Sequence, residues 1–71
     1  MDESNEVVAR LIKEDEGFRK AFNTHKNYNK MIEQMERKPR LTAEETIEKM
    51  RLKKLKLALK DELEEMISKS R

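Results

Sequence analysis

Residues 37–45 read Arg-Lys-Pro-Arg-Leu-Thr-Ala-Glu-Glu, and this stretch divides the chain into two helical arms. Pro39, the only proline, disfavours helix at its own position and at the residue before it. The first arm must therefore end near Lys38. Thr42 and Glu45 have the spacing of a capping box, in which each side chain accepts a hydrogen bond from the backbone amide of the other. A second helix is thus predicted to begin directly after Thr42.

Each arm outside this turn carries its apolar side chains on one face. At about 100° per residue, these side chains form one stripe around His25 on the first arm and one next to Leu55 on the second. Two such stripes joined by a short turn predict an all-α fold, an antiparallel two-helix hairpin with a coiled-coil-like seam. The predicted seam residues are Phe18, Phe22, His25, Tyr28, Ile32, Leu52, Leu55, Leu59, Leu63 and Met66.

A second, weaker break lies in the first arm. Gly17 follows an acidic stretch, and a glycine costs about 1 kcal/mol inside a helix. Asp15 is a suitable N-cap for a helix that restarts there. We therefore expect the first helix to be kinked or broken near Gly17. The predicted single helical-hairpin domain spans residues 1–71, with arms at about 4–37 and about 42–69 and the turn at 38–41.

Two segments carry a resemblance to a known family. One has aromatic and apolar residues at helical spacing from Phe18 to Ile32, with His25 among them, and the other is the leucine- and lysine-rich run of residues 52–63. In these segments the chain resembles the YdcH-like family, small bacterial helical-hairpin proteins classed as a domain of unknown function. Tyr28-Asn29 stands where the family more often shows Leu-Asp. The resemblance implies a helical hairpin and supplies no activity.

Composition excludes several classes of protein. The 17 basic and 15 acidic residues leave a net charge of only +2, and the chain has one glycine and no cysteine. Disulfide-stapled and turn-rich all-β folds are therefore excluded. No apolar run exceeds three residues, so we expect neither a transmembrane helix nor a signal peptide. The expected location is the cytoplasm.

The sequence predicts no enzyme, because no cysteine is present and the few hydroxyl residues lack triad-like neighbours. No cofactor, metal or small-molecule substrate is expected either. The only histidine, His25, lies at the centre of the first stripe without further metal ligands beside it. It has two open interpretations: a structural residue hydrogen-bonded across the hairpin or to another chain, or a pH-responsive group at an interface.

A few apolar side chains point away from the predicted seam and indicate a partner. We therefore predict a small non-enzymatic module that binds a helical protein or associates with itself as a dimer or higher oligomer. The residues of this partner or self-association face are Met31, Ile47, Met50 and Leu57.

Basic residues on one broad side of the hairpin suggest an alternative function. They predict weak, non-sequence-specific binding of nucleic acid or another anionic partner, driven mainly by counterion release. Three aromatic residues in the whole chain leave little for base stacking. The residues of this lysine-rich strip are Arg19, Lys26, Lys30, Lys49, Lys53, Lys56 and Lys60.

Overall fold

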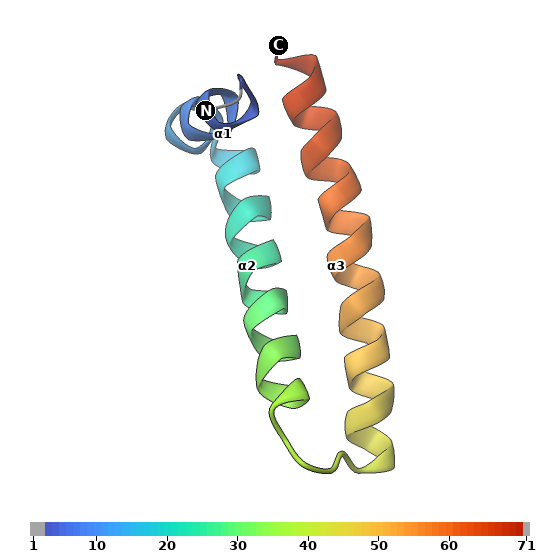
Figure 1. Ribbon diagram of the computed structural model, residues 1–71. Coiled ribbons are helices and arrows are strands. Elements are labelled where there is room, and N and C mark those ends of the chain that lie inside the picture. The colour runs from blue at the N-terminus through green and yellow to red at the C-terminus, as the bar shows by residue number, and fades with distance from the viewer. Residues whose placement is uncertain (1–2, 71) are drawn as a thin grey trace.

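The computed structural model describes residues 3–70, which form three helices and no strand: α1 (Glu3–Glu14), α2 (Glu16–Glu36) and α3 (Ala43–Lys69). Helices α2 and α3 lie side by side and are joined by a loop at one end (Figure 1). The all-α prediction is confirmed, but the two-helix count is wrong, because α1 is a separate helix. Positions 1, 2 and 71 of the predicted domain lie outside the described residues.

The break in the first arm lies at Asp15. Its backbone is extended (φ −116°, ψ 107°), and its side chain accepts a hydrogen bond of 3.0 Å from the amide of Phe18. This N-cap satisfies one of the amides left free at the start of α2. Gly17 lies inside α2, where an added Cβ would stand only 3.3 Å from the capping Oδ1 of Asp15. The helix is therefore broken rather than kinked, and Gly17 leaves room for the cap.

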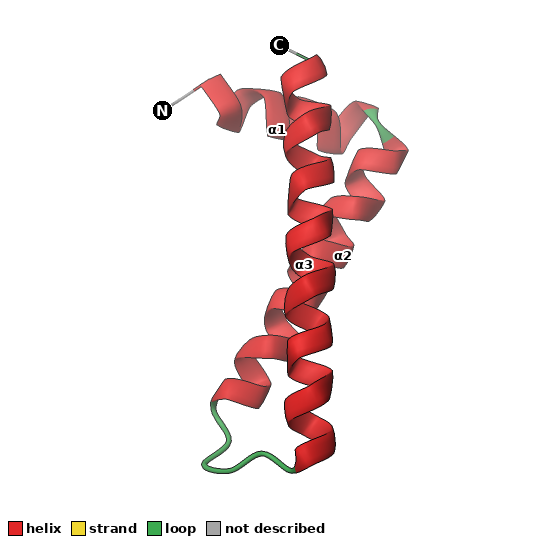
Figure 2. Ribbon diagram, turned by 90° about the vertical axis from the view of Figure 1, so that its right-hand side faces the viewer, coloured by secondary structure: helices red, strands yellow, loops and turns green. Residues whose placement is uncertain are grey.

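Helix α1 crosses the open end of the hairpin (Figure 2). Its buried side chains, Val7 and Leu11, form one core cluster with Phe18 of α2 and Leu63 of α3. At the same end, the Arg10 guanidinium donates a 2.7 Å hydrogen bond to the backbone carbonyl of Ser70. A straight first arm would leave Phe18 and Leu63 uncovered, so burial of this cluster is the physical reason for three helices instead of two.

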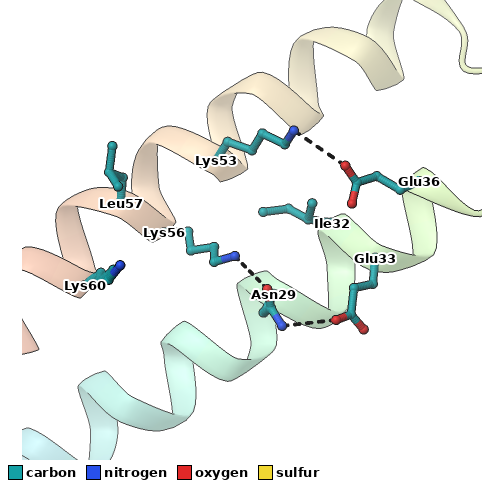
Figure 3. Close-up of a pocket in the computed structure, with 8 residues that line it drawn as sticks. All are labelled: Asn29, Ile32, Glu33, Glu36, Lys53, Lys56, Leu57 and Lys60. Carbon is teal, nitrogen blue, oxygen red and sulfur yellow. Dashed lines mark hydrogen bonds and ion pairs between the residues drawn. The ribbon is translucent and has the colours of Figure 1, made fainter.

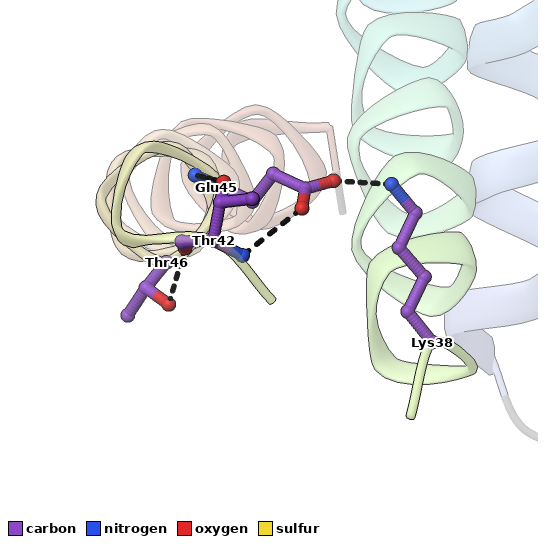
Figure 4. Close-up of polar contacts among 4 residues, drawn as sticks. All are labelled: Lys38, Thr42, Glu45 and Thr46. Atoms are coloured by element: carbon purple, nitrogen blue, oxygen red, sulfur yellow. Dashed lines mark hydrogen bonds and ion pairs between the residues drawn. The ribbon is translucent and has the colours of Figure 1, made fainter. Parts of the chain in front are cut away.

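The turn between α2 and α3 ends in the predicted capping box (Figure 4). The Glu45 amide donates to Thr42 Oγ1 and the Thr42 amide donates to Glu45 Oε1, each at 3.0 Å. Lys38 also donates from its ammonium group to Glu45. The hydrogen bond from Lys38, then that from the Thr42 amide, holds the pKa of Glu45 below its usual value. The turn is thus closed by contacts within eight residues of sequence.

Replacing Thr42 with alanine should destabilise the fold by about 1 kcal/mol, because the Glu45 amide loses its acceptor at the start of α3. Urea unfolding followed by circular dichroism measures the change. Thr46→Ala is the control, since the Thr46 hydroxyl donates to the Thr42 carbonyl and caps nothing. Equal losses in the two variants would contradict the assigned role of the cap.

The seam between α2 and α3 includes most of its predicted residues. Phe18, Ile32, Leu52 and Leu63 are buried, and the others are half-buried apart from Leu55. The assignment of Leu55 to the seam is wrong, because 39% of this residue is exposed. Leu52 and Leu63 are three turns apart and lie on one line of α3, whereas Leu55 is rotated about 60° away from Leu52. None of the described helices meets the length and hydropathy needed to cross a membrane.

Candidate functional site

The pairing of α2 and α3 leaves two broad sides of the hairpin open to a partner. One side holds a groove of about 550 Å³ between the two helices (Figure 3). We call it the lysine groove. It is lined by Asn29, Ile32, Glu33, Glu36, Lys53, Lys56, Leu57 and Lys60.

Several lysines of this side already have partners within the chain. The Glu36 carboxylate lies 3.5 Å from the ammonium groups of both Lys49 and Lys53. Lys56 donates a 2.7 Å hydrogen bond to Asn29 Oδ1, and Asn29 Nδ2 donates to Glu33 at 3.2 Å. Acidic and amide side chains of α2 therefore pair with lysines that were predicted to form the lysine-rich strip.

The remaining strip residues are spread around the same side. Lys26 lies over the ring of Phe22, 5.8 Å from its centroid. Arg19 and Lys30 are exposed on α2. Lys60 lines the groove and has neither a hydrogen bond nor an ion pair among residues 3–70. An incoming anion would thus find Lys60 available, whereas Lys49, Lys53 and Lys56 would first exchange their present partners.

His25 lies half-buried in the seam, and its Nε2 atom is buried without a hydrogen-bond partner in the described part of the chain. Nε2 does not make the predicted hydrogen bond across the hairpin. Burial lowers the pKa of His25, and the nearby charges of Lys56 and Lys60 lower that pKa further. These effects favour the neutral imidazole, and protonation would put a third cation beside two lysines.

The free energy of unfolding should depend on pH through His25. The pKa of His25 is lower in the folded chain than its usual value of about 6.5, so the unfolded chain binds more protons at pH values between the two. The contribution of neutral His25 to stability is complete well above its usual pKa and decreases as the pH falls toward the folded-state pKa. Urea unfolding between pH 8 and pH 5 measures this decrease. In His25→Gln the decrease should disappear, and an equal decrease in both proteins would refute the prediction.

Exposed apolar side chains mark the other broad side. Ile47 and Met50, 67% and 58% exposed, line a shallow hollow of about 530 Å³ with Leu55, Arg51 and Lys54. Leu55 also lines a second hollow, beside Ala58 on α3 and Tyr28 on α2. The two hollows therefore form one continuous surface. We call it the apolar face and define it by Tyr28, Ile47, Met50, Leu55 and Ala58.

The residues of the predicted partner face are all exposed in the structure. Leu57 is 61% exposed and lines the lysine groove, whereas Ile47 and Met50 line the hollow of the apolar face. All four residues are exposed, as the prediction that they point away from the seam requires, and Leu57 lies two turns after Met50, about 20° from it around the helix. Met31 is exposed on α2, one turn after Tyr28 and thus next to the apolar face.

Among residues 3–70, no three His, Cys, Asp or Glu side chains lie close enough together to bind a metal ion. The two broad sides are therefore the candidate functional surfaces. One offers paired and unpaired lysines in a groove, and the other offers contiguous apolar side chains with two cations at their edge.

Comparison with known proteins returns one family. The family model described as "Protein of unknown function (DUF465)" matches residues 18–67. This range covers nearly all of α2 and α3 and leaves out α1. Neither the curated proteins nor the solved structures contain a match.

Proposed function

The chain belongs to the DUF465 family, which is the YdcH-like family that its sequence resembles, and from its exposed apolar face we propose that it is a helical protein interaction module. Its docking surface is the apolar face. The proposed partner is a helical protein, either another chain or a second copy, bound in the cytoplasm without catalysis.

The observation that carries the proposal is the continuous exposure of Ile47, Met50 and Leu55 on one helix. Contiguous exposed apolar patches mark protein interaction sites on soluble proteins. An amphipathic partner helix would bury these side chains in the manner of helix-in-groove recognition. The flexible side chain of Met50 adapts to different partner shapes.

Anion binding at the lysine groove is the alternative. Lys60 supports it, since this ammonium group has no partner in residues 3–70. Glu36 opposes it, because its carboxylate holds Lys49 and Lys53 and would repel a phosphate. These two observations place the alternative second.

The apolar face is tested by removing its exposed side chains. Immobilised wild-type protein should retain a partner from the native cytoplasm, and Ile47→Ser/Met50→Ser should retain about tenfold less because apolar contact is lost. Lys60→Ser is the control, an exposed residue of α3 that lines the lysine groove on the other side. If both variants lose the partner alike, the apolar face is not the docking surface.

The alternative is tested with a labelled DNA duplex at two salt concentrations. Counterion release predicts binding at low salt that falls steeply as salt rises. Lys56→Glu/Lys60→Glu should abolish this binding if the groove is responsible. Tight binding of the duplex by the wild type, lost in this variant, would replace our proposal by the alternative.

A further inference from the structure

We propose that the partner at the apolar face is a second copy of this chain, with the two α3 helices packed antiparallel about a two-fold axis. This inference rests on the proposed function and names its partner. Leu55 packs against Ala58 of the second copy, and Arg51 and Lys54 lie opposite Glu62 and Asp61 of the second copy.

The outer surface of α3 has its charges separated along the helix. Arg51 and Lys54 line the apolar hollow in the first half, and Asp61 and Glu62 follow Ala58 in the second half. All four are exposed. Lys54, Asp61 and Glu62 have no ion-pair partner among residues 3–70, and Arg51 makes only an exposed contact of 3.7 Å with Glu48.

These charges cannot neutralise one another within a single helix. Lys54 and Asp61 are seven residues apart, which corresponds to about 10 Å along the axis. An antiparallel second helix removes this separation, because it brings the acidic half of one copy level with the basic half of the other. The chain therefore carries both halves of an electrostatically complementary contact.

One register pairs the charged groups and also brings Leu55 against Ala58. When Leu55 lies opposite Ala58 of the second copy, the residue numbers of facing positions add up to about 113. Arg51 then faces Glu62 of the second copy, and Lys54 faces its Asp61 within about half a turn. Two-fold symmetry repeats every contact, so a dimer gains each pair twice.

The pairs also agree in their position around the helix. Measured from Ala58, Arg51 and Glu62 lie about 20° and 40° to one side, and Lys54 and Asp61 about 40° and 60° to the other. In an antiparallel two-fold pair, residues on the same flank of the contact line meet. Each basic residue therefore shares its flank with the acidic residue that it faces.

Other arrangements of the same helices are less favourable. In a parallel pair, Arg51 and Lys54 lie beside the same residues of the second copy and repel them. The same repulsion arises in an antiparallel pair in which the two apolar hollows face each other. Figure 2 shows α3 in front of α1 and α2, so its outward side is not covered by either helix. The small side chain of Ala58 permits close approach of a second helix axis there.

Charge reversal tests the register. By sedimentation at low salt the wild type should be a dimer, and Arg51→Glu/Lys54→Glu and Asp61→Lys/Glu62→Lys should each raise its dissociation constant about tenfold or more through like-charge contacts. An equimolar mixture of these two variants should form a heterodimer, because every facing pair is again opposite in charge.

Lys30→Glu/Lys60→Glu is the matched control, with the same change in net charge on the other broad side of the hairpin. It should remain a dimer. Equal helicity of all variants by circular dichroism shows that the reversals at exposed positions leave the fold intact.

A monomeric wild type at high micromolar concentration, or a mixture that fails to associate, would overturn this inference. The proposed function is judged separately. A dimer that Ile47→Ser/Met50→Ser dissolves but charge reversal does not affect keeps the apolar face and rejects the register. A monomeric protein whose apolar face binds a different helical protein would likewise keep the apolar face as the docking surface and reject the register.

Discussion

Phe18→Ala is expected to lower the free energy of unfolding by about 3–5 kcal/mol. Phe18 is completely buried, and its ring stacks on Phe22 with centroids 6.0 Å apart. It also belongs to the core cluster that joins α1 to α3. The truncation leaves a cavity where the three helices meet. Since small domains have total stabilities of about 5–15 kcal/mol, this variant should be largely unfolded in moderate urea.

Urea unfolding by far-ultraviolet circular dichroism measures this loss. Leu57→Ala is the control, because Leu57 is an exposed apolar residue of α3 and its truncation should change stability by only about 0.5 kcal/mol. Similar unfolding midpoints for the two variants would show that the cluster around Phe18 is not the main source of stability.

Leu11→Ala should cost about 2–5 kcal/mol, and its main effect should be release of α1. Leu11 and Val7 are the buried residues that hold α1 against Phe18 and Leu63. Helices shorter than about 12–15 residues are marginal in water without such packing. Once released, α1 should lose most of its helical structure while the far end of the hairpin stays folded.

Hydrogen exchange resolves the effect by segment. Amides of α1 should exchange much faster in Leu11→Ala, while amides around Ile32 and Leu52 keep most of their protection. Lys13→Ala changes an exposed residue of the same helix and should leave α1 protected. Uniform loss of protection over all three helices would mean that α1 and the hairpin unfold as one unit.

The turn was predictable from the sequence because its contacts are local. Pro39 and the Thr42–Glu45 capping box act within a few residues, and their effect on the backbone does not depend on the rest of the fold. The capping role of Asp15 was also visible, but the choice between a kink and a break was not. That choice depended on Leu63, far away in the sequence.

The candidate surfaces were only partly predictable. Periodicity identified Ile47, Met50 and Leu57 as exposed but assigned Leu55 to the seam, because it gives angles within one helix and not the rotation of α3 against α2. The lysine-rich strip was likewise identified without Glu36, whose carboxylate comes from the opposite helix and pairs with Lys49 and Lys53.

The amino-acid sequence therefore established the family, the helical content, the position of the turn and most of the seam, since these follow from local hydrogen bonding and helical period. The crossing of α1, the lack of a partner for His25 Nε2 within residues 3–70 and the pairing of Glu36 with Lys49 and Lys53 required the folded chain. Each of these depends on contacts between residues far apart in sequence, and no local pattern encodes such contacts.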